Sequence, residues 1–376
     1  MKYDFQRLKD WMDGVCQKKY TPCCDVMIYQ DHKEVFRYLT GTTDLEGQHP
    51  VSPQTVYYLY SCTKPITAAT GMILLERGLL HLDDPVAKYL PAYADAYVLQ
   101  NGKQVRVGDQ MTVKHLFTMS AGLDYTLDRP AVQQIIRENP DASTVEVVNT
   151  FVKEPLLFVP GDQFEYSLCH DVLGAVIEVA AQKTLGEVMK TLLFDPLGMS
   201  HTYFPKKNDV VPNLAPIYRY WGEQGMDIEP SNRYVFGARY QSGGAGLVST
   251  TEDYALFGDC MACGGVGKSG ARVMKEETVK QMRTEQLSGF VHHPAFNCSA
   301  GEGYGYGLGV RVLIDRSAGQ RSHLGEFGWD GAAGAYLLCD PTCALSIVYM
   351  QHVQNWPEPL EFHKPVRDLT YDIMGL

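Results

Sequence analysis

The sequence predicts an α+β fold in which one β-sheet is assembled from both ends of the chain, with a helical insertion between them. Strand-like runs occupy 24–40 near the N-terminus. After about residue 236, Gly-rich turns alternate with further apolar runs, at 307–314, 335–339 and 345–350. Between about 80 and 235, long alternating runs are missing and helix-like segments are broken by Pro and Gly. Strands at both ends with helices between them favour a single discontinuous sheet.

We therefore predict two units. Residues 1–80 and 236–376 form one α/β sheet lobe, and residues 81–235 form a mainly helical lobe. Within the first, apolar residues at helical spacing over 5–15 predict an opening amphipathic helix. Two β-rich runs around the polar turn at 30–34 predict a hairpin. A last helix is expected over 359–374.

Composition excludes several classes of protein. The 376 residues are 45% hydrophobic and 20% charged, which is ordinary for a globular chain and not for a collagen-like, disordered or coiled-coil one. The 44 acidic and 33 basic residues give a net charge of −11, which argues against nucleic-acid or anionic-membrane partners. No apolar run approaches the roughly 18 residues of a spanning helix, and the first residues do not resemble a signal peptide. We expect a cytoplasmic protein with reduced thiols.

Several well-known catalytic and metal-binding motifs are absent or incomplete. G-x-S-x-G and H-E-x-x-H are absent. The pair Cys260-x-x-Cys263 lies in an apolar helical context without a second pair, which indicates buried thiols and not a zinc site. The sequence implies neither a metal nor an organic cofactor, and it does not indicate an oligomeric state.

The informative motif is Ser61-x-x-Lys64, which directly follows a strand-like run and begins a helix. Residues three apart share one helix face, so the lysine amine can reach the serine hydroxyl. A serine needs a base to act as a nucleophile. Lysine can be that base if burial lowers its pKa; otherwise it can lower the pKa of a neighbouring tyrosine. Taken alone, S-x-x-K is more often an N-cap serine with a solvated lysine.

The surrounding segments change that interpretation. They are 61–64, 76–86, 116–123, 160–167, 243–250 and 306–309. In order and spacing these segments resemble the serine β-lactamase and penicillin-binding-protein superfamily from about residue 35 to 352. The resemblance implies a mostly antiparallel sheet flanked by helices plus a helical lobe, with the active site between them.

The resemblance also implies roles for individual residues. Ser61 would be the acylated nucleophile and Lys64 its proton partner. Tyr166, in the segment that matches the second motif, would be the general base and later return the proton to the leaving group. The backbone N–H of Ser61 would provide one donor of the oxyanion hole.

The chain departs from the family pattern in two places. Leu168 stands where the family has an asparagine, so a polar contact is lost. The third motif, Lys-Thr-Gly or His-Thr-Gly, is also missing. Glu326, Phe327, Gly328 and Trp329 fall at its place in one alignment, and His323 begins the alternative one.

The first alignment resembles the Trp-Gly-Gly stretch of β-lactamase-fold carboxylesterases and acyltransferases. It makes the Trp329 N–H the second oxyanion donor. It also places Glu326 where a cation would meet a substrate carboxylate. A cation about 5 Å from the substrate carboxylate would attract it by roughly 3 kcal/mol at an effective dielectric near 20, and a carboxylate at the same place would repel it by a similar amount.

We therefore expect a serine hydrolase that transfers acyl groups through Ser61, acting on small uncharged esters or amides. A β-lactamase or D-Ala-D-Ala-type peptidase is the first alternative, which positive charge at His323 would favour. The second alternative is a non-hydrolytic binding protein that has kept the fold but not the catalytic activity. Retention of Ser61, Lys64 and Tyr166 together argues against the binder.

Overall fold

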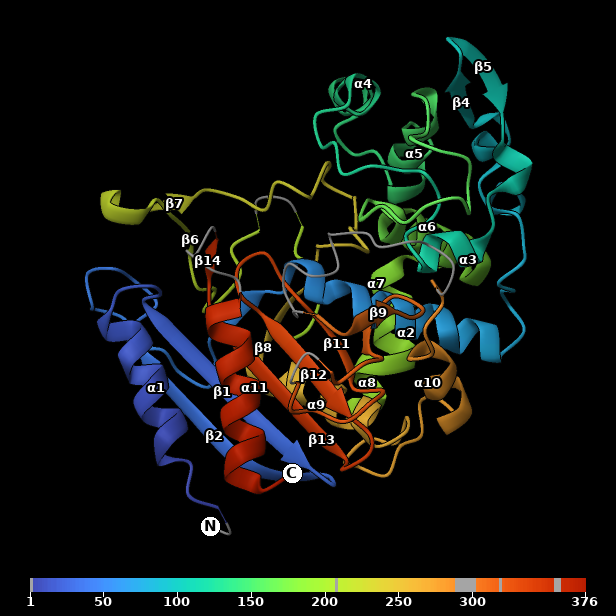
Figure 1. Ribbon diagram of the computed structural model, residues 1–376. Helices are drawn as coiled ribbons and strands as arrows, with labels where there is room; N and C mark the ends of the chain where they lie inside the picture. The colour runs from blue at the N-terminus through green and yellow to red at the C-terminus, as the bar shows by residue number, and fades with distance from the viewer. Residues whose placement is uncertain (1–2, 207–208, 288–301, 318–319, 355–359) are drawn as a thin grey trace.

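A computed structural model describes the chain except for residues 1–2, 207–208, 288–301, 318–319 and 355–359 (Figure 1). Its main feature is a seven-stranded sheet in the order β2-β1-β13-β12-β11-β10-β9, with all neighbours antiparallel. The strands are β1 (Cys23–Gln30), β2 (Lys33–Gly41), β9 (Tyr304–Tyr306), β10 (Arg311–Leu313), β11 (Phe327–Asp330), β12 (Tyr336–Asp340) and β13 (Leu345–Met350). The N-terminal hairpin pairs with the C-terminal strands through β1 and β13, as the sequence predicted.

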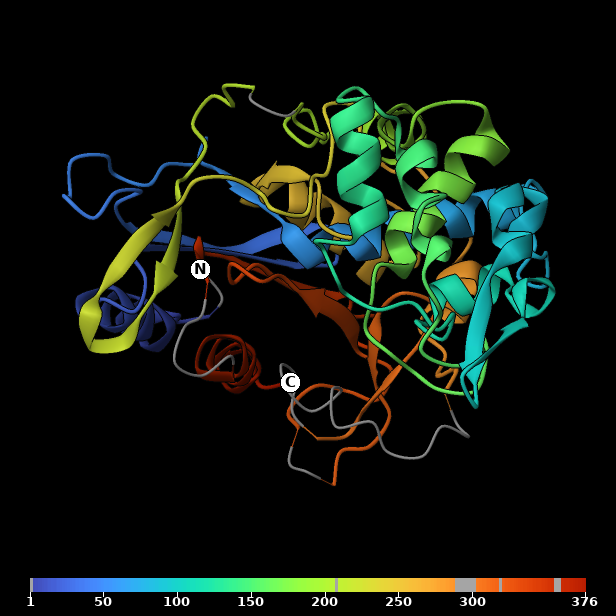
Figure 2. The same ribbon diagram turned by 90° about the horizontal axis from the view of Figure 1, so that it is seen from above.

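Alternate residues of each strand contribute to two different cores, because side chains alternate across a strand. Val26 and Leu338 face α1 (Gln6–Gln17) and α11 (Leu360–Met374). Their neighbours Met27 and Leu337 belong to the large second core. That core also contains α2 (Thr63–Glu76) and α9 (Thr251–Ala262). Figure 2 shows α1 and α11 on one side of the sheet and α9 on the other.

The middle of the chain is less purely helical than we predicted. Its helices are α3 (Val113–Phe117), α4 (Pro130–Glu138), α5 (Thr144–Val148), α6 (Cys169–Ala181), α7 (Leu185–Met189) and α8 (Asp195–Leu197), with a π-helical turn over Lys190–Phe194. Two hairpins accompany them, β4 (Tyr97–Gln100) with β5 (Lys103–Arg106), and β6 (Ile217–Tyr220) with β7 (Met226–Glu229). Strands of four residues are too short to produce a clear alternating pattern. The division into lobes at residues 80 and 236 stays a prediction.

Short pairings complete the fold. β14 (Val353–Gln354) runs parallel to β6 and so connects the C-terminal part of the chain to its middle. β3 (Val56–Tyr58) pairs with β8 (Val248–Thr250). The helix α10 (Glu276–Met282) packs on α2. Among the described residues, no helix is long and apolar enough to cross a membrane.

The α2 helix is almost entirely buried, which explains why it reads as apolar on all sides. Close packing requires a glycine in its middle. A Cβ at Gly71 would lie 2.7 Å from the Phe117 ring of α3. The helix is therefore held rigidly, and its N-terminus, where Ser61 and Lys64 lie, has a fixed position.

Candidate active site

Ser61 lies on a tight turn between β3 and α2. A 3₁₀ turn over Tyr60–Cys62 leads directly into the helix. Tyr60 has a φ of 46°, a left-handed conformation that is strained for a bulky residue. Its buried ring packs edge-on against Tyr234, with centroids 5.6 Å apart, and the Cys62 carbonyl accepts a hydrogen bond from Tyr254 at 2.8 Å. These contacts hold the turn and fix the direction of the serine side chain.

Tyr166 meets Ser61 across 105 residues of sequence. Its hydroxyl donates to the Ser61 Oγ at 2.8 Å. Tyr166 lies just before α6, which packs against α2. Burial raises the pKa of the Tyr166 phenol, so the group is protonated at neutral pH. The two residues that the resemblance pairs are thus within hydrogen-bonding distance of each other.

Lys64 is fully buried and surrounded by oxygen atoms. Its Nζ contacts the Ser61 Oγ at 3.2 Å, the Tyr125 hydroxyl at 3.2 Å and the Gly244 carbonyl at 2.9 Å. It also lies 4.6 Å from the centroid of the Tyr166 ring. Burial lowers the pKa of Lys64 to about 7, and nearby Asp171 opposes the shift. A large fraction of the amine is therefore neutral near pH 7 and can accept a proton.

Tyr125 was not identified from the sequence. It completes the oxygen shell of Lys64, and its ring stacks on Tyr166 with centroids 5.3 Å apart. Burial raises the pKa of this phenol too. The family-like segment at 116–123 ends only two residues earlier, but no spacing rule links Tyr125 to Lys64.

Asp171 and Gly244 fix the far side of the lysine. Asp171 is buried, accepts a hydrogen bond from Tyr240 at 2.7 Å, and has its pKa raised by burial. A Cβ at Gly244 would lie 2.5 Å from Asp171 Oδ2 and 3.6 Å from Lys64 Nζ. Only glycine lets the backbone pass between the two charged groups and present its carbonyl to the amine.

Trp329 reaches the cluster through its side chain. The indole Nε1–H donates to the Tyr166 hydroxyl at 3.3 Å. Its backbone N–H is directed elsewhere. The Gly331 N–H donates to the Ala335 carbonyl, on the side of β12. Backbone N–H groups two residues apart point to the same side of a strand, so the Trp329 N–H also points toward β12, at Leu337. The strand register does not support the Trp329 N–H as the second oxyanion donor.

Glu326 lies away from the cluster. Because side chains alternate, Trp329 and Glu326 are on opposite faces of the strand that begins at Phe327. The Glu326 carboxylate is fully buried, where it accepts hydrogen bonds from Tyr304 at 2.5 Å and Ser322 at 2.9 Å. Arg311 lies 3.7 Å from it. The expectation that Glu326 repels a substrate anion is corrected here, because this carboxylate faces α11 and is already paired.

The other residues predicted to contact substrate are explained by pairing or packing within the fold. His323 Nδ1 lies 2.8 Å from Asp340, and its ring packs near Tyr371 of α11, so it does not join the cluster. A Cβ at Gly328 would lie 1.9 Å from the Leu337 carbonyl, which explains the glycine by packing. Leu168 is buried in the large core at the start of α6.

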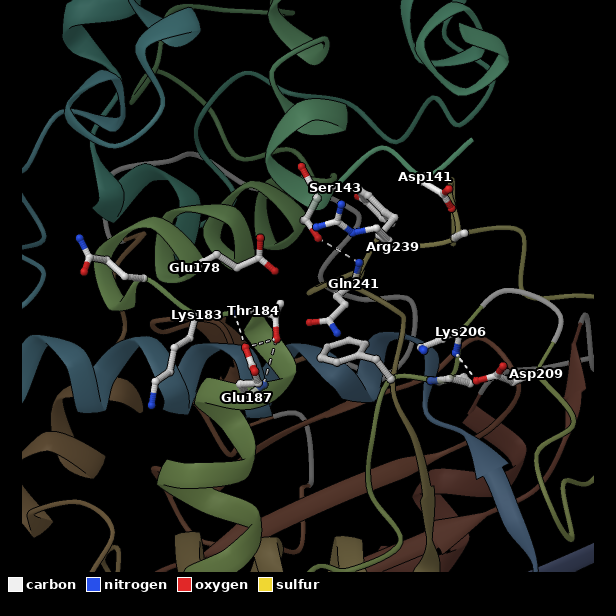
Figure 3. A pocket seen from close by; sticks show the side chains of 16 residues that line it. Asp141, Ser143, Glu178, Lys183, Thr184, Glu187, Lys206, Asp209, Arg239 and Gln241 are labelled. Atoms are coloured by element: carbon white, nitrogen blue, oxygen red, sulfur yellow. Dashed lines mark hydrogen bonds between the residues drawn. The ribbon is translucent and has the colours of Figure 1, made fainter. Parts of the chain in front are cut away.

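A cleft of about 940 Å³ borders the cluster at Tyr125. Its walls mix apolar side chains, including Val132, Ile136 and Phe236, with polar ones such as Arg233. This volume suits a small organic molecule. A second hollow of about 730 Å³ shares Pro205, Lys206 and Asp209 with this cleft, and Figure 3 shows the Arg239 and Glu178 side chains in it.

Comparison with known proteins places the chain among enzymes of one fold. The family model described as Beta-lactamase matches residues 8–372. Esterase EstB of Burkholderia gladioli is 28% identical, covering 92% of this chain and 90% of the relative. The solved structure of EstCE1, described as a hydrolase with promiscuous acyltransferase activity, is 26% identical with a TM-score of 0.78, covering 97% of this chain and 98% of the other.

A third comparison concerns the fold alone. Unliganded simvastatin synthase LovD of Aspergillus terreus is 19% identical with a TM-score of 0.75, covering 97% of this chain and 95% of the other. The mostly antiparallel sheet with flanking helices that the sequence predicted is therefore confirmed.

Proposed function

The chain belongs to the β-lactamase family and is a serine hydrolase, and from that premise we propose that it is a carboxylesterase working through an acyl-enzyme on Ser61. The arrangement of Tyr166, Ser61 and Lys64 carries the proposal. Their hydroxyl, hydroxyl and amine groups form a continuous chain with steps of 2.8 and 3.2 Å. A site that only binds a ligand has no need of a nucleophile with two proton-carrying neighbours.

The opposite pKa shifts suggest how the roles are divided. Lys64, with its pKa near 7, is the better base for the Ser61 proton, whereas the Tyr166 phenol remains protonated. In the proposed acylation the Ser61 Oγ attacks the ester carbonyl carbon while its proton moves to Lys64 Nζ. Tyr166 then donates its proton to the departing alkoxide oxygen and regains one from Lys64. In deacylation water attacks the acyl carbon and gives a proton to the same groups, the bond between the acyl carbon and Ser61 Oγ breaks, the carboxylic acid leaves, and Ser61 Oγ regains a proton.

The oxyanion that forms during attack needs backbone donors. The Ser61 N–H, at the start of the turn into α2, is our candidate for the first. We expect the second in the turn that begins at Gly331, since this backbone packs against the serine turn. A Cβ at Gly331 would lie 2.3 Å from the Leu59 carbonyl oxygen.

Uncharged esters are the substrate class that these residues favour. Beside Tyr166, the third-motif strand presents the neutral indole of Trp329 and no cation. Similarity to EstB, which is named an esterase, supports the same choice over the β-lactamase or peptidase alternative.

Two measurements test the proposal. The first is the rate on short-chain p-nitrophenyl esters compared with a chromogenic cephalosporin. We expect efficient ester cleavage and weak cephalosporin turnover, and the reverse order would overturn the substrate assignment. Intact-mass spectrometry after treatment with a fluorophosphonate is the second. One adduct should form on the wild type and on the exposed-serine control Ser269→Ala, and none on Ser61→Ala.

A further inference from the structure

Cys263, one cysteine of the Cys260-x-x-Cys263 motif, lies in a cluster of side chains that the catalytic proposal does not use. Cys263 follows the last residue of α9, and Asp259 lies one turn earlier on the same helix face. His32, from the turn between β1 and β2, meets both of them. The liganding atoms of these three residues all lie within 4.8 Å of one another. We propose that His32, Asp259 and Cys263 bind a zinc ion and thereby tie the β1–β2 hairpin to α9.

The three side chains lie close to the spacing of ligands around a four-coordinate zinc ion. His32 Nδ1 lies 2.8 Å from Asp259 Oδ2, and Cys263 Sγ lies 3.7 Å from Asp259 Oδ1. Ligands about 2.0–2.3 Å from zinc stand roughly 3.3–3.8 Å apart, so only small side-chain shifts are required. Nitrogen, oxygen and sulfur are all ligands that zinc accepts. A water molecule would take the fourth position.

Burial of the aspartate favours cation binding, and partial exposure of the histidine leaves the site accessible. The Asp259 side chain is completely buried, while that of His32 is 32% exposed. A buried carboxylate is stabilised by a positive ion beside it. The partly exposed His32 ring leaves one side of the site open to solvent, through which an ion can enter.

A second triad of the same composition provides an internal comparison. His323, Asp340 and Cys343 also lie within 4.8 Å of one another. The two triads are at the same end of the sheet, since the Asp31 N–H of one hairpin turn donates to the Ala344 carbonyl of the other. They differ in what the aspartate already binds.

The Asp340 carboxylate is occupied by other donors. It accepts hydrogen bonds from Tyr371 at 2.5 Å, from the Thr342 N–H at 3.0 Å and from His323. For a metal to bind there, several of these bonds would have to break. Among the described residues, the hydrogen bonds to the Asp259 carboxylate come from His32 and Cys263, the proposed co-ligands themselves. The site at Asp259 is therefore the one that we assign.

Binding exchanges a proton for the metal. Burial raises the pKa of the Cys263 thiol to about 12, so the free thiol is protonated at neutral pH. As the sulfur–zinc bond forms, that proton leaves to solvent. His32 would bind through Nδ1, which leaves Nε2 as the ring nitrogen that carries a proton. No oxidation or reduction takes place.

Cobalt(II) is a suitable probe, because a thiolate ligand gives it a strong near-ultraviolet charge-transfer band. Chelator-treated full-length protein is titrated with cobalt chloride, and zinc chloride is then added to displace it. We expect one cobalt per chain, the charge-transfer band, and a rise in Tm with zinc. Cys263→Ser should lose the band and weaken binding at least tenfold, while Cys343→Ser should behave as the wild type.

Other outcomes overturn the assignment. No uptake at micromolar cobalt or zinc would do so, as would a band that survives in Cys263→Ser. Equal losses in Cys263→Ser and Cys343→Ser would point to surface binding. His32→Asn, on the exposed hairpin, provides a second variant if Cys263→Ser folds poorly by circular dichroism. Since the triad is apart from Ser61, Ser61→Ala should bind cobalt normally, so this test and that of the esterase can fail independently.

Discussion

Replacing the buried amine of Lys64 with the thioether of methionine should destroy activity and yet stabilise the protein at neutral pH. Methionine fills nearly the same volume without a charge. The fold lowers the pKa of Lys64 from its ordinary value of 10.5 to about 7, because burial penalises the ammonium. Such a shift means that folding disfavours the protonated amine, by about 1.4 kcal/mol for each unit.

The magnitude follows from proton linkage. At pH 7 the unfolded lysine is fully protonated and the folded one about half, so burying it costs about 4 kcal/mol. The substitution also removes the hydrogen bonds to the Ser61 Oγ, the Gly244 carbonyl and the Tyr125 hydroxyl, and this loss destabilises the protein by about 1.5–3 kcal/mol. We expect Lys64→Met to raise the free energy of unfolding by about 1–3 kcal/mol at pH 7.

The pH dependence is the sharper test. Between pH 7 and 10.5 the unfolded wild type binds more protons at this site than the folded one, so wild-type stability rises with pH. The cost of burying Lys64 falls from about 4 kcal/mol at pH 7 to about 2 kcal/mol at pH 9. The advantage of Lys64→Met should therefore shrink by about 2 kcal/mol over that interval.

Urea denaturation followed by tryptophan fluorescence, on both proteins at pH 7, 8 and 9, measures this difference. Lys114→Met, in the short α3 helix, serves as a control for loss of a lysine outside the cluster. A stability difference that stays constant with pH would refute the desolvation argument. So would a Lys64→Met variant that is clearly less stable than the wild type at pH 7.

Four further results are expected. If Lys64 is the base, kcat/KM for a neutral ester should rise as pH increases through about 7, and a plateau already reached at pH 5 would contradict this. Tyr166→Phe keeps the ring but loses the hydroxyl on Ser61, and should lower kcat about 10²–10⁴-fold in the p-nitrophenyl ester assay. Trp329→Phe keeps an aromatic ring but removes the indole donor to Tyr166, worth about 1 kcal/mol, so a roughly fivefold loss of kcat is expected, and a loss as large as that of Tyr166→Phe would assign the indole a greater role. Glu326→Gln should leave the preference between neutral and anionic esters unchanged but destabilise the protein by about 3 kcal/mol in urea, because Arg311 loses its buried partner; a new preference for anionic esters would restore Glu326 to the cleft.

Local pattern was sufficient for much of the fold. The run at 345–350 was predicted as a strand and is β13, Leu345–Met350. The last helix was expected over 359–374 and α11 covers Leu360–Met374. Both are long enough for their periodicity to be read. The hairpins β4–β5 and β6–β7 were missed because their strands have only four residues each.

The third motif shows where a linear alignment is insufficient. Without gaps it put Glu326 and Trp329 in the same cleft, although residues three apart on a strand face opposite ways. Which of the two faces the nucleophile depends on which side of the sheet α2 covers. That is decided by packing, and it places Trp329 beside Tyr166 and Glu326 beside Arg311.

By itself the sequence indicated the family, through segments spread from about residue 35 to 352, and predicted the sheet shared by both ends of the chain and the serine and lysine three residues apart on one helix face. Tertiary structure alone decided the protonation states. Whether Lys64 or a tyrosine accepts the Ser61 proton depends on how completely each group is removed from water, and on Tyr125 and Gly244, which reach the amine from 61 and 180 residues away. Desolvation acts through space, and the order of residues along the chain does not record it.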